Sequence, residues 1–328
     1  MPINFVLIVL SAFLLSLFFI LLLKKASLKY NVLVSQGIPH IGGIAVGLAF
    51  ILSSLSVFLA LNILPKQALG VIIASSLILI FGIIDDLHEL SVTAKFLVQL
   101  TCAFILILFG VRTQIVYIGN TLNILITLLW VLGITNAFNH LDIIDGLAGS
   151  TAVIIGAAFL YLSILGYDMK TVTLALSLTG AILGFLLYNL PPARIYMGNS
   201  GSHFLGFVLA ALALMISYAS MDRKVALLSP LLILGLPIFD TAFLILMRAS
   251  KEKSIFKKSN DHLALRLLKK GYTKQKALSF MLSLALLFVL SGILLTRIPN
   301  LFGLLIVATV AVVSLAVTRD MGKVAIDG

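Results

Sequence analysis

Long apolar stretches recur along almost the whole chain, and they constrain its fold more than any other feature. Of the 328 residues, 61% are hydrophobic and only 11% are charged. A water-soluble domain of this length has too little interior to hide so much apolar surface, so lipid must be the solvent for most of it. The stretches also lack the short alternating segments of a membrane β-barrel. We therefore expect an all-α integral membrane protein.

A membrane-spanning helix needs about 20 apolar residues, and the chain has room for about eleven. The N-terminal stretch lacks a basic leader and a small-residue cleavage site, so we expect a first span there rather than a removable signal. The predicted spans are 5–23, 41–61, 68–84, 94–110, 121–136, 147–165, 172–189, 203–220, 225–247, 277–294 and 301–318. We expect residues 1–328 to form one polytopic domain, interrupted by a basic loop over 248–276.

Basic residues set the expected orientation, because loops on the cytoplasmic side carry an excess of Lys and Arg. Alternate loops after the first span, together with the C-terminal tail, hold 17 of the 23 basic residues, and the opposite side holds 6. Ten of the 17 lie in the loop 248–276. We therefore expect the N-terminus outside and the C-terminus in the cytoplasm, in an inner or plasma membrane that the chain crosses many times.

Acidic residues are unevenly placed as well, since nine of the twelve fall on the predicted cytoplasmic side. Acids follow no rule of membrane topology, so this bias needs another cause. Asp85 and Asp86 form one cluster, at the cytoplasmic end of the third span. Asp is a good helix cap, and capping is the simpler interpretation of this pair.

A second polar cluster, NAFNHLDIIDGLAGS, follows the fifth span. Its side chains recur every three residues, at Asn136, Asn139, Asp142 and Asp145. A period of three drifts by about 60° per step around an α-helix, so the four cannot share one straight face. They can converge in a 3₁₀ segment or where the helix unwinds at Gly146.

If these two clusters are neighbours in the bundle, four carboxylates would repel one another in a medium of low dielectric constant. They then need protons, a basic partner or a divalent cation. Carboxylate and amide oxygens suit Mg²⁺ or Mn²⁺, and Mg²⁺ commonly completes its shell with water and a substrate phosphate. The two clusters therefore predict an active site at the cytoplasmic membrane face.

Two Gly-rich segments open helices on the same side. The segment GNSGS precedes the eighth span, and a helix start with free N–H groups can bind an anion; its small residues are Gly198, Ser200, Gly201 and Ser202. The segment PHIGGIAVG supplies Pro39, Gly42 and Gly43. For this second segment, close helix packing through small residues is an equally good interpretation.

The basic loop contains NDHLALRLLKKG, which is typical of a short amphipathic helix that Asn260 or Asp261 begins and Gly271 ends. Such a helix can lie flat on anionic lipid. His262 and Arg266 stand four residues apart, so they can share a face and reach a phosphate. Asp240 lies inside the ninth span, where an acid indicates function by default.

These motifs together resemble the polyprenyl-phosphate N-acetylhexosamine-1-phosphate transferases, the group that includes phospho-N-acetylmuramoyl-pentapeptide transferase. The resemblance covers nearly the whole chain, in order: PHIGG, FGIIDDLHELSVTAK, TNAFNHLDIIDGLAG, YNLPPARIYMGNSGSHFLG, LPIFDT and DHLALRLLKKGYT. It implies transfer of a sugar 1-phosphate, with GlcNAc the first expectation by analogy, from a UDP-N-acetylhexosamine to polyprenyl phosphate, undecaprenyl phosphate above all. UMP is released, and Mg²⁺ or Mn²⁺ is required. Membrane lipids are expected as further partners, and nucleic acid is not expected. A homodimer is one possible assembly.

The resemblance also implies roles for single residues. Asp85, Asp86, Asp142 and Asp145 would be the catalytic acids, and Asp86, Asn139 and Asn199 would bind the metal. Substrate-binding positions would be Pro39, Gly42, Gly43, Asn136, Asn189, Gly198, Ser200, Gly201, Ser202, Asp240, His262 and Arg266. Direct in-line attack by the lipid phosphate is favoured over a covalent phospho-Asp intermediate, since that phosphate is already mostly dianionic at neutral pH.

Three positions depart from the family pattern. Asn199 stands where most relatives have Asp, and Ile143 replaces a glycine of the DGxDG pattern. Ala264 and Leu265 occupy two histidine positions of the HxHHRL pattern. These departures suggest a divergent branch with a different sugar or pocket, or else a catalytically weakened relative that binds the lipid carrier. An ion-coupled transporter that uses the aspartates for ions is a separate alternative.

Overall fold

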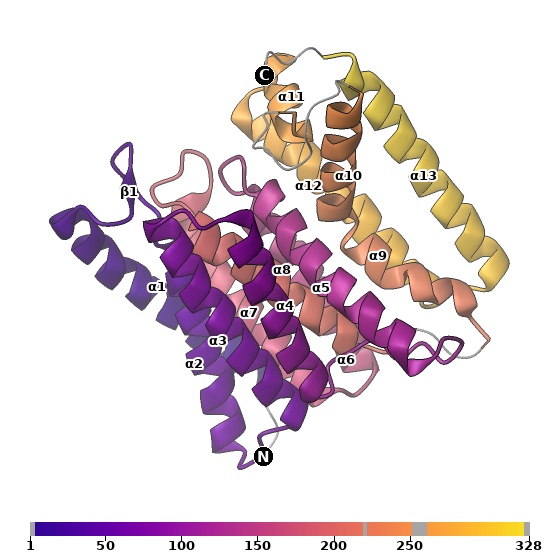
Figure 1. The fold of residues 1–328 in the computed structure, drawn as a ribbon, viewed down its shortest axis with the longest axis horizontal. Coiled ribbons are helices and arrows are strands. Elements are labelled where there is room, and N and C mark those ends of the chain that lie inside the picture. Colours follow the sequence, from indigo (N-terminus) through magenta and orange to yellow (C-terminus); the bar gives the residue numbers. More distant parts are fainter. Residues whose placement is uncertain (1–3, 219–221, 251–260, 325–328) are drawn as a thin grey trace.

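The computed structural model describes residues 4–218, 222–250 and 261–324, and helices dominate these segments (Figure 1). The helices are α1 (Phe5–Tyr30), α2 (Gly42–Ala60), α3 (Lys66–Leu87), α4 (Val92–Leu108), α5 (Asn120–Leu141), α6 (Leu147–Leu165), α7 (Met169–Asn189), α8 (Gly198–Met215), the 3₁₀ helix η1 (Lys224–Leu228), α9 (Ser229–Ile233), α10 (Gly235–Ala249), α11 (Leu263–Lys269), α12 (Lys274–Leu295) and α13 (Asn300–Gly322). Two short strands, β1 (Val34–Ser35) and β2 (Ile38–Pro39), form an antiparallel hairpin between α1 and α2.

The expectation of an all-α membrane protein is confirmed. Among the described residues, nine helices are long and apolar enough to cross a membrane, and a bent pair of helices can supply a tenth span. The 17-residue helix α4 is apolar but shorter. Each of the eleven predicted spans overlaps one of these helices, and the additional helix α11 lies in the basic loop.

The ninth predicted span is broken rather than straight, which corrects the expectation of one continuous helix over 225–247. Residues Lys224–Ile233 and Gly235–Ala249 form two helical pieces bent by 74°. Pro237 explains the break, because its ring would clash with the carbonyl of Ile233 in a continuous helix and it has no N–H to donate. Gly235 leaves room at the bend for the ring of Phe288, which a Cβ would overlap.

Two apolar cores hold the helices together. The larger is built mainly by α1 to α8, and the smaller joins α10 to α13 with the end of α5. Helix α10 packs along α5, and α12 packs along α6, so the two groups are in contact (Figure 1). Apolar side chains on α13, such as Leu301 and Leu315, each 68% exposed, point away from both cores, as lipid-facing residues do.

Glycines let three helix ends meet. A Cβ on Gly43 would overlap the backbone of Gly201, and a Cβ on Gly82 would overlap that of Ser200. The beginning of α2, the end of α3 and the beginning of α8 therefore approach more closely than side chains would allow. Small residues at a helix contact are a common device in membranes.

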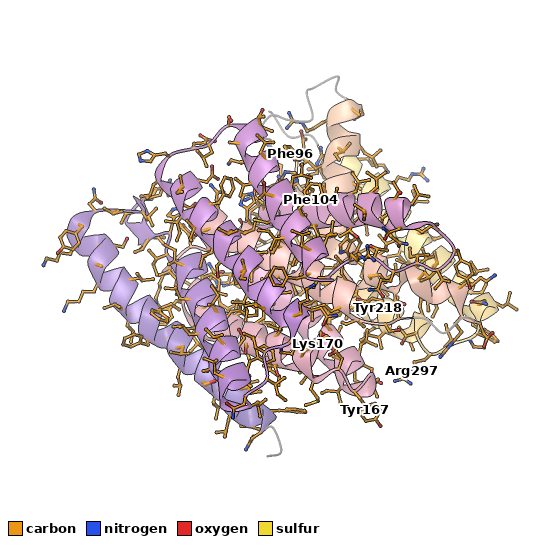
Figure 2. The ribbon with its side chains drawn as sticks, turned by 60° about the horizontal axis from the view of Figure 1, so that its bottom comes forward. Phe96, Phe104, Tyr167, Lys170, Tyr218 and Arg297 are labelled. Atoms are coloured by element: carbon orange, nitrogen blue, oxygen red, sulfur yellow. The ribbon has the colours of Figure 1, made fainter. Side chains whose placement is uncertain are left out.

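The bundle has two distinct ends. At the first, which we call the carboxylate end, α3 and α5 finish and α8 begins. At the other, the far end, Tyr167, Lys170 and Arg297 are found (Figure 2). The beginning of α1 and the end of α13 lie at opposite ends of the bundle (Figure 1), as an odd number of spans requires.

Candidate active site at the carboxylate end

Helix α5 runs further than its apolar stretch and carries the first polar residues of the second cluster with it. Asn136 and Asn139 lie on the helix, Asp142 is its C-cap, and the chain then unwinds until Gly146, at φ +79°, begins α6. Asn136 pairs with Gln99 of α4, with 2.7 Å between its Nδ2 and the Oε1 of Gln99. The helix unwinds before Gly146, as the period of three allowed, but Asn136 turns toward α4 and is separated from the rest of the cluster.

Asn139 faces α8 instead. Its Nδ2 donates to Oδ1 of Asn199 (3.2 Å) and to Oγ of Ser202 (2.9 Å). The amide oxygen of Asn139 has no hydrogen-bond partner among the described residues. Two amide side chains and a hydroxyl, drawn from α5 and α8, therefore meet at the carboxylate end.

The segment GNSGS is the first turn of α8, and a carboxylate already occupies its N–H groups. The N–H groups of Asn199 and Ser200 donate to Oδ1 and Oδ2 of Asp86, at 2.7 and 2.9 Å. Gly198 has φ +75°, and a Cβ there would approach Oδ2 of the same carboxylate to 2.7 Å. Asp86 on α3 is therefore an N-cap supplied from another helix, and the anion that this turn holds belongs to the protein itself.

Asp85 is satisfied by a different set of partners. Its carboxylate accepts from Nζ of Lys95 (2.6 Å) and from the N–H of Leu90 (2.9 Å), and its side chain is fully buried. An ion pair with one fully buried partner leaves a costly unpaired charge if the other partner is removed. The two adjacent acids thus have separate surroundings: Asp85 links α3 to α4, and Asp86 links α3 to α8.

Asp142 and Asp145 are less well compensated. Burial raises the pKa of Asp142 to about 7, and the nearby charges of Asp86 and Asp145 raise that pKa further. Asp145 accepts from the N–H of Ala193 and from Nζ of Lys274, each at 3.3 Å. Asp142 has no hydrogen-bond partner among the described residues. Acids from α3 and from the α5–α6 connection therefore lie close enough to repel one another.

The segment PHIGG forms a backbone contact with the connection between α7 and α8. The carbonyl of Pro39 accepts from the N–H of Tyr196 (2.8 Å), Gly42 donates to the carbonyl of Tyr196 (3.0 Å), and Gly43 donates to that of Met197 (2.8 Å). This geometry favours the packing interpretation of the two glycines. Asn189 also acts within the protein, since it accepts from the N–H of Gly146 and donates to the carbonyl of Ile195, both at 3.0 Å.

Asp240 and His262 form a buried pair on the other side of α5. Oδ2 of Asp240 lies 3.0 Å from Nδ1 of His262, and Oδ1 accepts from the N–H of Leu263 at 3.0 Å. Asp240 is 0% exposed and His262 is 6% exposed. An acid inside a span is therefore matched here by a histidine from the basic loop.

Arg266 does not share the partners of His262. Its guanidinium donates to Oδ1 of Asp261 (2.7 Å) and to the carbonyls of Met321 (2.9 Å) and Val324 (2.7 Å) at the end of α13. Its N–H groups are thus largely taken up by protein oxygens, which leaves few of them for a phosphate. A phosphate-binding role for Arg266 stays a prediction, whereas its contacts are those of a structural clamp.

Helix α11 itself packs against protein. Ala264, at one of the two altered histidine positions, is 0% exposed within the smaller core, and Leu265 packs against that core. Leu263 and Leu267 are also 0% exposed. The apolar side of this helix faces α10, α12 and α13, which corrects the expectation that it lies flat on lipid.

Four basic residues near the site received no role from the sequence alone. Lys95 and Lys274 pair with acids of the site, and a signal existed for Lys95, because it closes the motif FGIIDDLHELSVTAK. His40 packs edge to face on Tyr196, and burial lowers its pKa while the charge of Asp86 opposes that shift. His140 follows Asn139 directly, yet its neighbour in space, His262, is far away in the sequence.

The donor atoms at this end suit a hard divalent cation. Among the described residues no three His, Cys, Asp or Glu side chains are arranged as a ready metal cage. Mg²⁺ rarely needs one, since it commonly takes one or two carboxylates and completes its shell with water and phosphate. Burial and, secondarily, repulsion by Asp86 and Asp145 raise the pKa of Asp142, and a bound cation would relieve this repulsion, so the residues fit such an ion.

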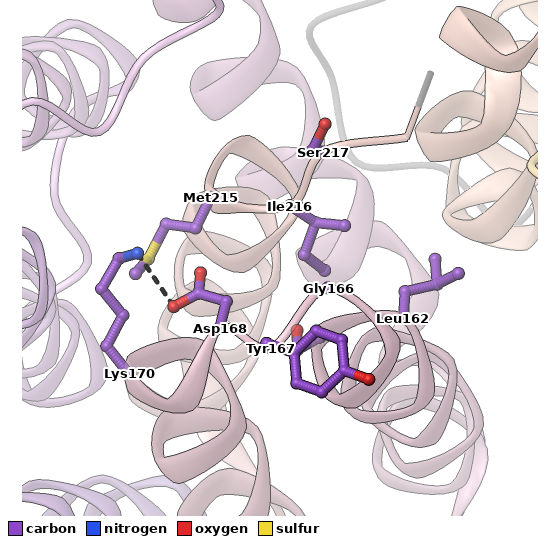
Figure 3. A pocket seen from close by; sticks show the side chains of 9 residues that line it. Leu162, Gly166, Tyr167, Asp168, Lys170, Met215, Ile216 and Ser217 are labelled. Atoms are coloured by element: carbon purple, nitrogen blue, oxygen red, sulfur yellow. Dashed lines mark hydrogen bonds and ion pairs between the residues drawn. The ribbon is translucent and has the colours of Figure 1, made fainter. Parts of the chain in front are cut away.

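The far end holds a cavity of about 320 Å³ (Figure 3). Tyr167, Asp168, Lys170 and Met215 contribute to its wall. Asp168 is already paired, with Nζ of Lys170 at 2.8 Å and Oγ1 of Thr171 at 2.7 Å. This cavity is at the opposite end from the carboxylates and takes no part in the candidate site.

Comparison with known proteins adds to this geometry. The family model described as glycosyl transferase family 4 matches residues 68–217. A probable undecaprenyl-phosphate N-acetylglucosaminyl 1-phosphate transferase of Bacillus subtilis (strain 168) is 31% identical over 266 residues, which cover 78% of this chain and 73% of that protein. A phospho-N-acetylmuramoyl-pentapeptide-transferase of Shouchella clausii is 28% identical, covering 79% and 83%. The undecaprenyl-phosphate alpha-N-acetylglucosaminyl 1-phosphate transferase of Thermotoga maritima is 27% identical, covering 79% and 77%. With its helical membrane bundle and its acids gathered at one end, the chain belongs to glycosyl transferase family 4.

Proposed function

We propose that this protein transfers N-acetylglucosamine 1-phosphate from UDP-N-acetylglucosamine to a polyprenyl phosphate, undecaprenyl phosphate in the first instance, and releases UMP. The names of the relatives support both the sugar and the lipid. One observation of the structure carries the proposal: acids from α3 and from the α5–α6 connection gather with amide side chains of α5 and α8 at a single end of a membrane bundle. A site at the membrane boundary is where a lipid phosphate and a water-soluble nucleotide can meet.

The reaction needs little proton transfer. A polyprenyl phosphate is mostly dianionic at neutral pH, so its oxygen can attack the sugar-bearing phosphorus of the nucleotide directly, with UMP as the leaving group. The obstacle is repulsion between two anionic substrates. Positively charged groups at the site, Lys95 and Lys274 among them, lower this repulsion.

We further propose that Mg²⁺ or Mn²⁺ is bound here, by Asp86 with the amide oxygens of Asn139 and Asn199, beside Asp142 and Asp145. Such an ion would neutralise charge on the phosphates of both substrates. The chain's own contribution is to hold these oxygens in place, through the cap that Asp86 provides to α8 and through the amide pair of Asn139 and Asn199.

The carboxylate end would then face the cytoplasm, with the N-terminus outside and the protein in the inner or plasma membrane. The excess of Lys and Arg in the loops of that end supports this orientation. An ion-coupled transporter would place its polar residues near the middle of the bilayer. Here the acids of the candidate site lie at helix ends, which favours the transferase.

The test uses the purified full chain in detergent with polyprenyl phosphate, Mg²⁺ and a panel of UDP-sugars, with UMP release as the measured quantity. We expect release that needs both the lipid phosphate and the divalent cation, fastest with UDP-N-acetylglucosamine. Reactions without lipid phosphate are the control for simple hydrolysis of the donor. Absence of UMP with every donor would contradict the proposed reaction, and release without a divalent cation would contradict the metal proposal alone.

A further inference from the structure

Asn139 and His140 are consecutive residues at the end of α5, and they contact different halves of the molecule. Asn139 donates to side chains of α8. The ring of His140 instead lies against the ring of His262, with the centroids 6.1 Å apart and the planes at 64°. One turn of α5 therefore connects the acid and amide groups of α3, α5 and α8 to the buried pair of Asp240 and His262.

Asp240 fixes which nitrogen of His262 is available. Oδ2 of Asp240 lies 3.0 Å from Nδ1 of His262, so Asp240 occupies this ring nitrogen. Nε2 of His262 is then the ring atom left for another partner. It can donate to a phosphate oxygen when it carries a hydrogen.

His140 has an unmatched polar atom at the same place. Its Nδ1 is buried and has no hydrogen-bond partner among the described residues. A buried polar atom without a partner costs free energy, and such atoms in native proteins call for an explanation, a bound ligand being one of them. His140 lies in the last turn of α5, at the same end of the bundle as the candidate site.

We propose that His140 is a further substrate-binding residue, which together with His262 forms a pair of imidazoles that holds one phosphate group of a substrate. The inference rests on the proposed function, in which both substrates bring phosphate. The shared chemistry is a phosphate oxyanion bound by ring N–H groups. Its source is either the diphosphate of the nucleotide sugar or the headgroup of the lipid carrier, and the experiment distinguishes the two.

Three variants of the full-length protein test this. His140→Phe keeps an aromatic ring of similar size against His262 and removes both nitrogens, whereas His140→Gln restores one polar group. His88→Phe is the matched control, since His88 is exposed at the end of α3. UDP-N-acetylglucosamine binding is measured by calorimetry in detergent without polyprenyl phosphate. The KM for polyprenyl phosphate is measured at saturating UDP-N-acetylglucosamine, and thermal unfolding reports on folding.

We expect His140→Phe either to lower the affinity for UDP-N-acetylglucosamine or to raise the KM for polyprenyl phosphate, in each case at least tenfold. The affinity changes if the nucleotide sugar supplies the phosphate, and the KM changes if the lipid does. His140→Gln should recover a substantial part of the loss, and His88→Phe should match the wild type, with similar unfolding temperatures throughout. The proposal is overturned if His140→Phe keeps both constants within twofold. It is also overturned if both His140 variants lose binding equally while unfolding at a lower temperature, because that result indicates a structural role.

UMP release by the wild-type protein distinguishes a failure of this inference from a failure of the proposed function. If the wild-type protein releases no UMP with any donor, that result contradicts both the proposed function and the inference. An active wild-type protein with unaffected His140 variants removes the inference alone.

Discussion

Two polar clusters sit on either side of the end of α5, and they differ in how well their charges are matched. On the side of α3 and α8, Asp142 lies among other acids and has no hydrogen-bond partner among the described residues, and its pKa is raised to about 7. On the side of α11 and α13, Arg266 is surrounded by Asp261 and by backbone carbonyls, with the ring of Phe243 5.3 Å from its guanidinium.

The difference teaches how to separate binding residues from structural ones in this protein. Charges that are fully paired inside the protein are satisfied without a ligand, and removing one partner leaves the other buried and uncompensated. Charges that repel one another destabilise the fold and are useful only when a ligand relieves them. We therefore expect the cluster around Asp142 to act in function and the cluster around Arg266 to act in stability.

The largest effect is expected for Arg266→Met, which conserves much of the side-chain volume and removes the charge. Asp261 and the carbonyls at the end of α13 lose their donor, so the free energy of unfolding should fall by about 3–5 kcal/mol. Equilibrium unfolding in detergent measures this change. Lys270→Met is the control: its ion pair with Asp320 is exposed, and such pairs contribute about 0–1 kcal/mol. A similar fall in the free energy of unfolding in both variants would show that the buried Arg266 cluster contributes no more to stability than an exposed ion pair.

Asp145→Asn should cause a large loss of activity and little loss of stability, in contrast to Arg266→Met. Removing one charged group from a site that stabilises a transition state typically lowers the rate by about 10²–10³-fold. UMP release and thermal unfolding, measured on the same preparation, separate the two effects. Asp168→Asn, at the far end, is the matched control and should remain active. Wild-type turnover in Asp145→Asn would show that this acid only orders the α5–α6 connection.

The pKa of Asp142 predicts how stability varies with pH. Because its folded-state pKa is raised from 3.8 to about 7, the folded protein binds more protons than the unfolded chain between these values. Its contribution to stability is therefore complete below pH 3.8 and is lost as the pH rises through about 7. Unfolding temperatures measured from pH 4.5 to 7.5 without divalent cations should show this decline. Asp142→Asn should flatten it, and an unchanged slope in that variant would rule out Asp142 as the cause.

The smallest effect is expected for Asn199→Asp. The new carboxylate keeps an acceptor for Nδ2 of Asn139 and adds negative charge, so the Mg²⁺ concentration for half-maximal activity should fall by about 3- to 10-fold. Asn136→Asp is the control, because Asn136 pairs with Gln99 instead. A higher Mg²⁺ requirement in Asn199→Asp would mean that this position does not contact the ion.

Much of the architecture was predictable, because a lipid environment forces apolar residues into long helices and polar ones to the ends. The helices that overlap the eleven predicted spans, and the gathering of acids at helix ends, follow from that rule. The break before Gly235 was not predicted, although Pro237 carries the signal, because the whole stretch is apolar enough to cross a membrane.

Contacts between residues that are distant in the sequence were also not predicted. No periodicity links His140 to His262, or Asp86 to the first N–H groups of α8, since these contacts depend on how whole helices pack. For the same reason the burial of Arg266 escaped prediction. The loop that carries it is strongly basic, which suggests a solvated surface, and only the end of α13 turns its guanidinium inward.

The glycine contacts between α2, α3 and α8 have a practical meaning for anyone who wishes to change the sugar that this protein accepts. A library of variants at Gly43, Gly82 or Gly201 would push α2, α3 and α8 apart. Most of these variants would misfold, whatever residue is introduced. Diversity is better directed at exposed side chains of the neighbouring connections, such as Arg194, which can be changed without moving the helices. The packing of the helices and the selectivity for the sugar can thus be engineered separately.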